Sequence, residues 1–325
     1  MPASPVPVWS LRFARAYVTT MRPYLLFVSG AAGLVGLSFI PHAAASRIAL
    51  AFAALFLSYG LGQALTDCFQ TDTDALSAPY RPLVAGIVSR RQVLTVSLAG
   101  LSAVVLVLAY LSPRILALGV LAVVGLLTYT FFKRRWWGGP PWNSWIVALL
   151  PLMGRAVDRG WTPAAPVRPG DANGLAFLLA VLAVFSGYAN FVVMGYFKDI
   201  SADRATGYRT FPVVFGWRAA AIYGDVTAGA ALALTACALT LLGTNVVSFV
   251  VFAAGGALYA RAQVAMHRTR DERATGVPIA NGVRALVLLC IALVAANHVR
   301  WVPLLAVFYL LFELALRLRP ERGQV

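Results

Sequence analysis

The chain has 325 residues, of which 60% are hydrophobic and only 12% are charged. Soluble globular proteins carry about 25% charged residues, so this composition excludes an ordinary water-soluble domain and indicates that lipid covers much of the surface. The formal net charge is +15. It does not indicate a nucleic-acid partner, because the basic residues stand in short segments between apolar runs, as membrane topology signals do.

Ten apolar runs follow one another along the chain and predict transmembrane helices, since open sheet edges cannot face lipid. They cover residues 24–41, 48–66, 93–111, 115–132, 143–154, 174–198, 219–242, 246–263, 283–299 and 301–318. The fifth run is short for a span, and the boundary between the last two is not sharp. The sequence therefore predicts an all-α, polytopic transmembrane bundle of nine or ten helices, in one domain over residues 1–325.

Basic residues are distributed unequally between the connections of this bundle. The N-terminal segment 1–20 and Arg22 are basic, and so are the alternate connections at 81–91, 133–135, 198–218 and 261–273. Positively charged segments stay in the cytoplasm, so these connections and the N-terminus are predicted to be cytoplasmic. The basic tail 319–325 favours the same side, and hence ten helices.

Acidic residues are scarce, and two groups of them stand where the second and sixth apolar runs end: Asp67, Asp72 and Asp74, then Asp199 and Asp203. At helical spacing Asp67 and Asp74 share a face, and so do Asp199 and Asp203. Gln70 lies on the first of these faces, and Tyr196 lies one turn before Asp199. Both groups fall on the predicted cytoplasmic side.

Carboxylates at a membrane boundary are costly unless they are paired, hydrated or bound to cations. Mg²⁺ takes oxygen ligands and bridges carboxylates to phosphates, and the guanidinium fork of arginine matches phosphate oxygens. The two groups, with arginines beside them, therefore predict a diphosphate site that binds divalent cations. The alternative is that the aspartates are solvated loop charges or ion pairs with Arg81 and Arg204.

These residues resemble the motifs of the UbiA superfamily of intramembrane prenyltransferases. The first family motif is Asn-Asp-x-x-Asp-x-x-x-Asp, followed by a Pro-Tyr-Arg-Pro-like turn, and it matches residues 66–74 and 79–82. The second is Asp-x-x-Asp-x-x-x-Asp-Arg-x-x-Gly-x-x-Thr-x-Pro, and it matches residues 196–212. Tyr129 and Lys133 match a Tyr-x-x-x-Lys pair of the family, and Arg22 matches its usual opening.

The resemblance implies a helical bundle around a central cavity with a polar cap. It implies that the chain ionises a prenyl diphosphate and transfers the prenyl group to an aromatic or other small acceptor. The implied metal ligands are Asp67, Asp72, Asp74, Asp199 and Asp203, with two Mg²⁺ ions expected and Mn²⁺ as an alternative. The implied catalytic residues are Asp67, Asp74, Asp199, Asp203 and Lys133. The implied substrate contacts are Arg22, Gln70, Arg81, Tyr129, Tyr196, Lys198, Arg204 and Arg209.

The sequence departs from the family motifs at a few positions. Gln70 replaces the second acid of the first motif, and Tyr196 replaces the first acid of the second. Asp72 is a candidate to compensate, although it lies off the face that Asp67 and Asp74 share. Because of these changes, a membrane terpene cyclase is an alternative function, in which the prenyl cation closes on itself without an acceptor. A transporter is the remaining alternative, since intramembrane charges also suit that class.

Overall fold

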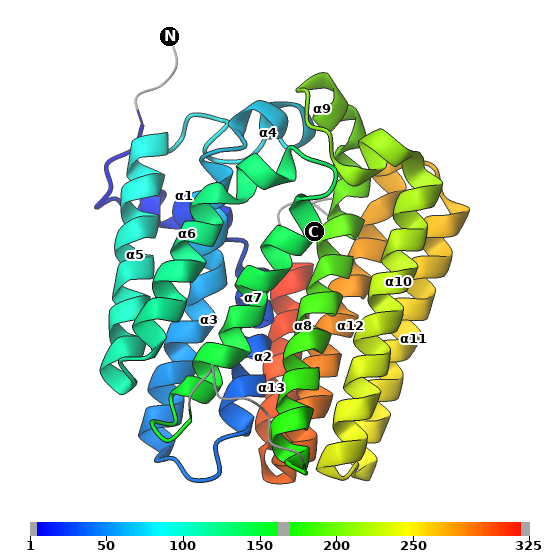
Figure 1. Cartoon of the computed structure of the whole chain (residues 1–325). Coiled ribbons are helices and arrows are strands. Elements are labelled where there is room, and N and C mark those ends of the chain that lie inside the picture. Colours follow the sequence, from blue (N-terminus) through cyan, green and yellow to red (C-terminus); the bar gives the residue numbers. More distant parts are fainter. Residues whose placement is uncertain (1–4, 162–169, 320–325) are drawn as a thin grey trace.

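The computed structural model describes residues 5–161 and 170–319, and these residues form an all-helical bundle (Figure 1). The ends of the predicted N-terminal segment and C-terminal tail, residues 1–4 and 320–325, lie outside the described residues. The long helices are α2 (Pro23–Ser38), α3 (Ala45–Asp67), α5 (Arg90–Leu111), α6 (Ile115–Lys133), α7 (Gly139–Ala156), α8 (Ala172–Tyr196), α10 (Phe211–Leu242), α11 (Val246–Arg268), α12 (Gly276–Asn297) and α13 (Val302–Arg317).

Each of the ten predicted apolar runs is a helix in the structure. Among the described residues, eight helices are long and apolar enough to cross a membrane, and α1 (Leu11–Met21) with α2, bent by 55°, makes a ninth span if the pair counts as one. The short fifth run is α7, which is not among these eight helices but still runs between the two ends of the bundle (Figure 1). The chain is thus a multi-pass integral membrane protein.

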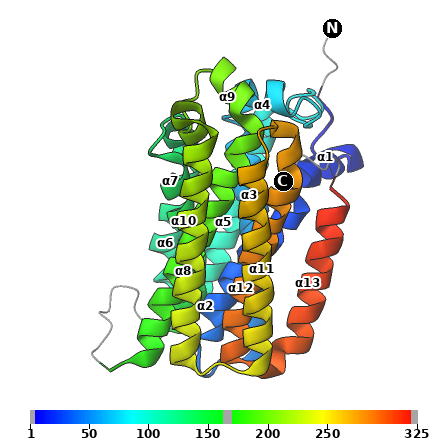
Figure 2. The same cartoon turned by 90° about the vertical axis from the view of Figure 1, so that its right-hand side faces the viewer.

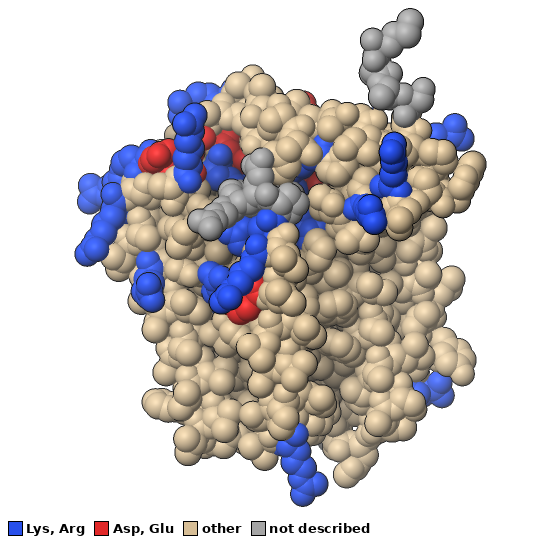
Figure 3. Space-filling model, turned by 180° about the vertical axis from the view of Figure 1, so that it is seen from behind, with Lys and Arg blue, Asp and Glu red and all other residues tan. Residues whose placement is uncertain are grey.

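Successive helices alternate in direction, so alternate connections gather at one end. This end carries the short helices α4 (Thr71–Ser77) and α9 (Ile200–Ala205), and the upper ends of α1 and α13 lie near it (Figure 2). On the face seen in Figure 3, most lysine and arginine side chains lie toward this same end. The structure therefore places the basic connections on one side of the bundle, as the sequence predicts.

Small residues set the spacing at the centre of the bundle, where α2 crosses α7. A Cβ atom on Gly36 would lie 2.0 Å from the carbonyl oxygen of Pro151, and one on Gly154 would lie 2.6 Å from the carbonyl oxygen of Gly33. Backbones in membranes approach closely where residues are small. This contact brings α7 against α2 and allows α3, α6, α7 and α8 to surround a common interior.

Candidate active site

A polar chamber lies at the end of the bundle that carries α4 and α9. Side chains from α2, α3, α6, α7 and α8 and from the segments that follow α3 and α8 line it. Most of the residues predicted from the sequence are among them: Arg22, Asp67, Gln70, Asp74, Arg81, Tyr129, Lys133, Tyr196, Lys198 and Asp199. The structure therefore brings both acidic groups to one site, although more than a hundred residues separate them.

Asp67, the last residue of α3, faces a cationic side chain from the bend between α1 and α2. Arg22 Nη2 donates to both carboxylate oxygens of Asp67 at 3.0 Å, and Gln63 Nε2 donates to Oδ1 at 2.6 Å. Arg22 has φ 52°, a left-handed conformation that costs energy for a residue with a Cβ atom. The bend holds this strained residue so that its guanidinium points into the chamber.

Asp74 on α4 forms a second buried ion pair, with Arg81 of the following turn. Burial raises the pKa of the Asp74 carboxyl, and the charge of Arg81 opposes that rise. Burial by itself would lower the pKa of Arg81, but Asp74, Asp67 and Asp199 together hold it above its ordinary value. Arg81 therefore lies in the electrostatic field of both acidic groups.

Lys133, the last residue of α6, is held by the two residues that replace family acids. Its Nζ donates to Gln70 Oε1 at 2.6 Å and lies 5.7 Å from the ring centre of Tyr196. The Tyr196 hydroxyl is 3.3 Å from that of Tyr129. A neutral amide and an aromatic face leave more of the ammonium charge available to an anion than carboxylates would.

The remaining predicted residues do not line the chamber. Asp72 is half-exposed, pairs with Arg134 at 2.8 Å and accepts a hydrogen bond from Tyr208 at 3.1 Å. Arg204 and Arg209 are exposed. The geometry therefore does not support the metal-ligand role predicted for Asp72 or the substrate contacts predicted for these two arginines.

Asp203 does not line the chamber and is fully buried. Its Oδ2 accepts a hydrogen bond from Thr210 Oγ1 at 3.0 Å, while Oδ1 has no hydrogen-bond partner among the described residues. Lys133 lies in the field of Asp203 and Asp199. A buried carboxylate oxygen without a donor is costly, so Asp203 retains capacity to accept a hydrogen bond or bind a cation.

The donor atoms of the chamber suit a hard divalent cation. Asp67, Asp74 and Asp199 supply carboxylate oxygens, and Gln70 adds an amide oxygen. Within residues 5–161 and 170–319, no group of three or more His, Cys, Asp or Glu side chains could hold a metal ion by itself. Mg²⁺ commonly binds through one or two carboxylates, with waters and substrate phosphates completing its shell, so the residues fit an ion that arrives with a phosphate ligand.

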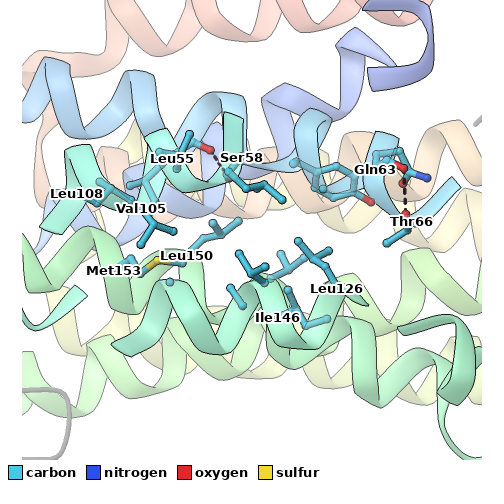
Figure 4. Close-up of a pocket in the computed structure, with 18 of the residues that line it drawn as sticks. Leu55, Ser58, Gln63, Thr66, Val105, Leu108, Leu126, Ile146, Leu150 and Met153 are labelled. Carbon is cyan, nitrogen blue, oxygen red and sulfur yellow. Dashed lines mark hydrogen bonds between the residues drawn. The ribbon is translucent and has the colours of Figure 1, made fainter. Parts of the chain in front are cut away.

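An apolar pocket lies deeper in the bundle, between α3, α5, α6, α7 and α8 (Figure 4). Figure 4 shows Leu108 and Met153 at one end of it and Gln63 and Thr66 at the other. Tyr59, Gln63, Asn143 and Tyr188 line both this pocket and the polar chamber. The two spaces therefore meet at these four residues, here named the seam.

Tyr59, Asn143 and Tyr188 of the seam form a hydrogen-bonded group, and the sequence did not predict the seam residues as site residues. The hydroxyls of Tyr59 and Tyr188 are bonded together, and Asn143 Nδ2 donates to the Tyr188 hydroxyl at 3.3 Å. Tyr59, Gln63 and Asp67 follow one another at four-residue spacing on α3. That spacing was the one available sequence signal, since residues i, i+4 and i+8 share a helix face.

Comparison with known proteins places the chain in one family. The model of the UbiA prenyltransferase family matches residues 25–281. The digeranylgeranylglyceryl phosphate synthase of Natronomonas pharaonis is 35% identical over 208 residues, which are 63% of this chain and 70% of that protein. The enzyme of the same name from Halobacterium salinarum is 33% identical over 223 residues, 67% of this chain and 76% of its own length.

Solved structures share the fold. A UbiA homologue from Aeropyrum pernix superposes with a TM-score of 0.67 at 22% identity, covering 80% of this chain and 94% of that one. A UbiA homologue from Archaeoglobus fulgidus, solved bound to GPP and Mg²⁺, superposes with a TM-score of 0.64 at 17% identity. The match covers 86% of this chain and 99% of that one. The motif residues, the bundle and these likenesses agree: the chain belongs to the UbiA prenyltransferase family and is an intramembrane prenyltransferase.

Proposed function

We propose that the chain binds a prenyl diphosphate with its diphosphate in the polar chamber and its prenyl tail in the apolar pocket, and that it transfers the prenyl group to an acceptor. The observation that carries this proposal is the seam, where a chamber lined by charged side chains meets a pocket lined mainly by aliphatic ones. A molecule with an anionic head and a hydrocarbon tail matches both halves. The allylic carbon that joins head to tail would then lie at the seam.

The cationic side chains of the chamber suit the first chemical step. When the allylic C–O bond breaks, its electron pair goes to the diphosphate, and negative charge grows on the phosphate oxygens. Arg81, Lys133 and Lys198 line the space that the diphosphate would occupy. Preorganised charges in a water-poor site stabilise such developing charge strongly. Mg²⁺, when bound with the diphosphate through Asp67, Asp74 and Asp199, would add Lewis-acid stabilisation of the same charge.

The tyrosines near the seam suit the second step. Tyr59, Tyr129 and Tyr188 line the chamber where the allylic cation would form. Aromatic faces attract cations, and a closed, mostly apolar pocket keeps water from the cation until the acceptor reaches it. The acceptor atom then bonds to the allylic carbon, and the acceptor loses a proton to the diphosphate or to water.

We propose a glyceryl phosphate lipid as the first acceptor to test, ahead of an aromatic one. The support is the likeness to the two synthases named above, whose names specify a digeranylgeranylglyceryl phosphate product. We also propose that the end bearing the chamber is cytoplasmic, because the basic connections gather there. Labelling of Ala85→Cys and Ala205→Cys in a variant without native cysteines should report the cytoplasmic side, and Thr244→Cys the opposite side.

Turnover of a panel of prenyl diphosphates by purified protein tests the function. We expect release of inorganic diphosphate with a glyceryl phosphate lipid or an aromatic acceptor present, loss of activity in EDTA, and recovery with Mg²⁺ or Mn²⁺. A titration of bound Mg²⁺ with a non-reactive prenyl thiolodiphosphate would count the ions, for which two remain the expectation. A hydrocarbon or terpene alcohol made without acceptor would favour the cyclase, and full activity without any divalent ion would contradict the proposed role of the metal.

A further inference from the structure

A second polar pocket, here named the outer pocket, lies next to the chamber in the cap, the end of the bundle that carries α4 and α9. Three segments line it: the end of α4 with the turn to Arg81, the start of α9 with the residues before it, and the connection between α11 and α12. The last segment contains η2 (Glu272–Thr275) and contributes Arg270 and Arg273 to the pocket. None of these η2 and α11–α12 residues lines the chamber.

The outer pocket and the chamber share three charged residues, Arg81, Lys198 and Asp199. A ligand in either space can therefore meet the same guanidinium and ammonium groups. The two arginines of the α11–α12 connection lie only on the outer side. Cationic groups thus continue from the chamber to the aqueous surface of the cap.

Side-chain contacts hold the outer wall of this pocket in place. Both carboxylate oxygens of Glu272 accept from the backbone N–H of Ser201 at 3.1 Å, and Oε1 also accepts from the Ser201 hydroxyl at 2.5 Å. Asp271 accepts from the backbone N–H of Arg273 at 2.9 Å. Two acids of the pocket are therefore engaged with donors of the protein itself, and Glu272 ties the α11–α12 connection to α9.

The reaction creates a need for such a pocket, and this step rests on the proposed function. Prenyl transfer leaves inorganic diphosphate in the chamber, while the prenyl product stays in the apolar pocket or in lipid. A multiply charged anion cannot leave through hydrocarbon. It has to leave through the cap into water. The outer pocket adjoins the chamber in the cap, and basic side chains line both spaces.

We infer that the outer pocket is a second anion site, which binds inorganic diphosphate after it leaves the chamber, with Arg270 and Arg273 as its outer contacts. Guanidinium groups bind phosphate oxygens through paired N–H donors. The same phosphate chemistry could come from the headgroup of a glyceryl phosphate acceptor, and the experiment has to separate the two sources.

The test measures binding of labelled inorganic diphosphate to purified protein whose chamber is filled with a non-reactive prenyl thiolodiphosphate. We expect wild-type protein to bind diphosphate under these conditions. Arg270→Gln with Arg273→Gln should weaken that binding by about tenfold or more, since the change removes two charge-assisted contacts. Glycerol 3-phosphate should displace the label poorly; displacement as efficient as that by diphosphate would overturn the assignment in favour of a headgroup site.

Arg268→Gln is the control for a single lost charge, because Arg268, the last residue of α11, is exposed next to this connection but does not line the pocket. It should leave diphosphate binding within about twofold of wild type, which excludes a mere effect of net charge. Arg273→Gln alone should give a smaller loss than the double variant and does not alter the bonds from Arg270 Nη1 to the carbonyls of His267 and Thr269.

Two outcomes overturn the inference: no diphosphate binding when the chamber is filled, or equal binding by wild type and the double variant. Failure of the thiolodiphosphate to bind any of the proteins is a different result, which contradicts the proposed function. In that case diphosphate binding is measured without the analogue. A difference between wild type and the double variant then shows whether the outer pocket binds the anion.

Discussion

The two acidic segments each follow the end of a long helix, α3 and α8, yet the structure uses them differently. In the first, Asp67 and Asp74 are each paired with an arginine, Arg22 and Arg81. In the second, Asp203 is buried with one oxygen lacking a hydrogen-bond partner among the described residues, and Asp199 lines both the chamber and the outer pocket. The first segment therefore fixes arginines around the chamber in addition to offering Asp67 and Asp74 to Mg²⁺, whereas the second leaves a carboxylate oxygen of Asp203 without a protein donor among the described residues.

This difference suggests how the site works when only some of the family acids are present. A buried ion pair holds its two side chains in one arrangement, because loss of either partner leaves an uncompensated charge. Arg22 and Arg81 are thereby presented to an anion in defined positions. An unsatisfied carboxylate oxygen favours whatever cation or donor can reach it. The following variants test this division of roles.

The largest effect is expected on stability, from breaking a pair of the first segment. Asp67→Asn leaves Arg22 buried without its anion and should lower the free energy of unfolding by about 3–5 kcal/mol. Arg22→Gln should cost a similar amount, and the double variant less than the sum of the two. Detergent-driven unfolding in mixed micelles measures all three. Additive losses in the double variant would contradict the pairing.

The next largest effect is expected from Asp203 in the second segment. Asp203→Asn preserves the side-chain shape but removes the charge, and it should reduce turnover by about 100- to 1,000-fold, the loss typical of one transition-state charge contact. The free energy of unfolding of this variant should not fall, because the buried carboxylate of Asp203 has an oxygen without a hydrogen-bond partner among the described residues. The measurement is turnover against Mg²⁺ concentration. Asp225→Asn is the control, since Asp225 lies in an exposed pair with His267 away from the chamber.

A smaller effect is expected from Gln70, which replaces a family acid and holds Lys133. Gln70→Leu removes the acceptor at 2.6 Å from Lys133 Nζ. Hydrogen bonds to charged groups contribute about 1.5–3 kcal/mol, so KM for the prenyl diphosphate should rise by at least tenfold, as about 1.4 kcal/mol corresponds to a factor of ten. Gln70→Glu should hold Lys133 in its wild-type position, but the new carboxylate would neutralise the ammonium charge of Lys133. Wild-type kinetics in Gln70→Leu would show that Lys133 does not need this contact.

The smallest effect is expected from Asp72, whose predicted ligand role the geometry does not support. The Asp72–Arg134 pair is about half-exposed, and exposed pairs contribute about 0–1 kcal/mol. Asp72→Ala should therefore change turnover by less than about fivefold. The Mg²⁺ dependence should stay the same as in wild type. A shift of that dependence comparable to the shift in Asp203→Asn would restore Asp72 as a ligand.

Much of this protein could be predicted from its sequence, because the deciding quantities are local. Apolar run length and scarcity of charge predict all ten long helices, since lipid accepts only segments that satisfy their own backbone. The basic connections predict which loops share an end. Motif spacing predicts most of the chamber residues, but the shared helix faces expected from that spacing are wrong. Asp67 ends α3 while Asp74 lies on α4, and Asp199 lines the chamber while Asp203 of α9 does not.

Only the tertiary structure decided which partner each side chain meets. Asp72 and Asp74 are two residues apart, yet one pairs with Arg134 outside the chamber and the other with Arg81 inside it. The seam joins Tyr59 of α3, Asn143 of α7 and Tyr188 of α8, and the outer pocket needs the α11–α12 connection. These contacts depend on how closely helices pack, as at Gly36 and Gly154, and packing distances between distant segments leave no periodic signal in a single sequence.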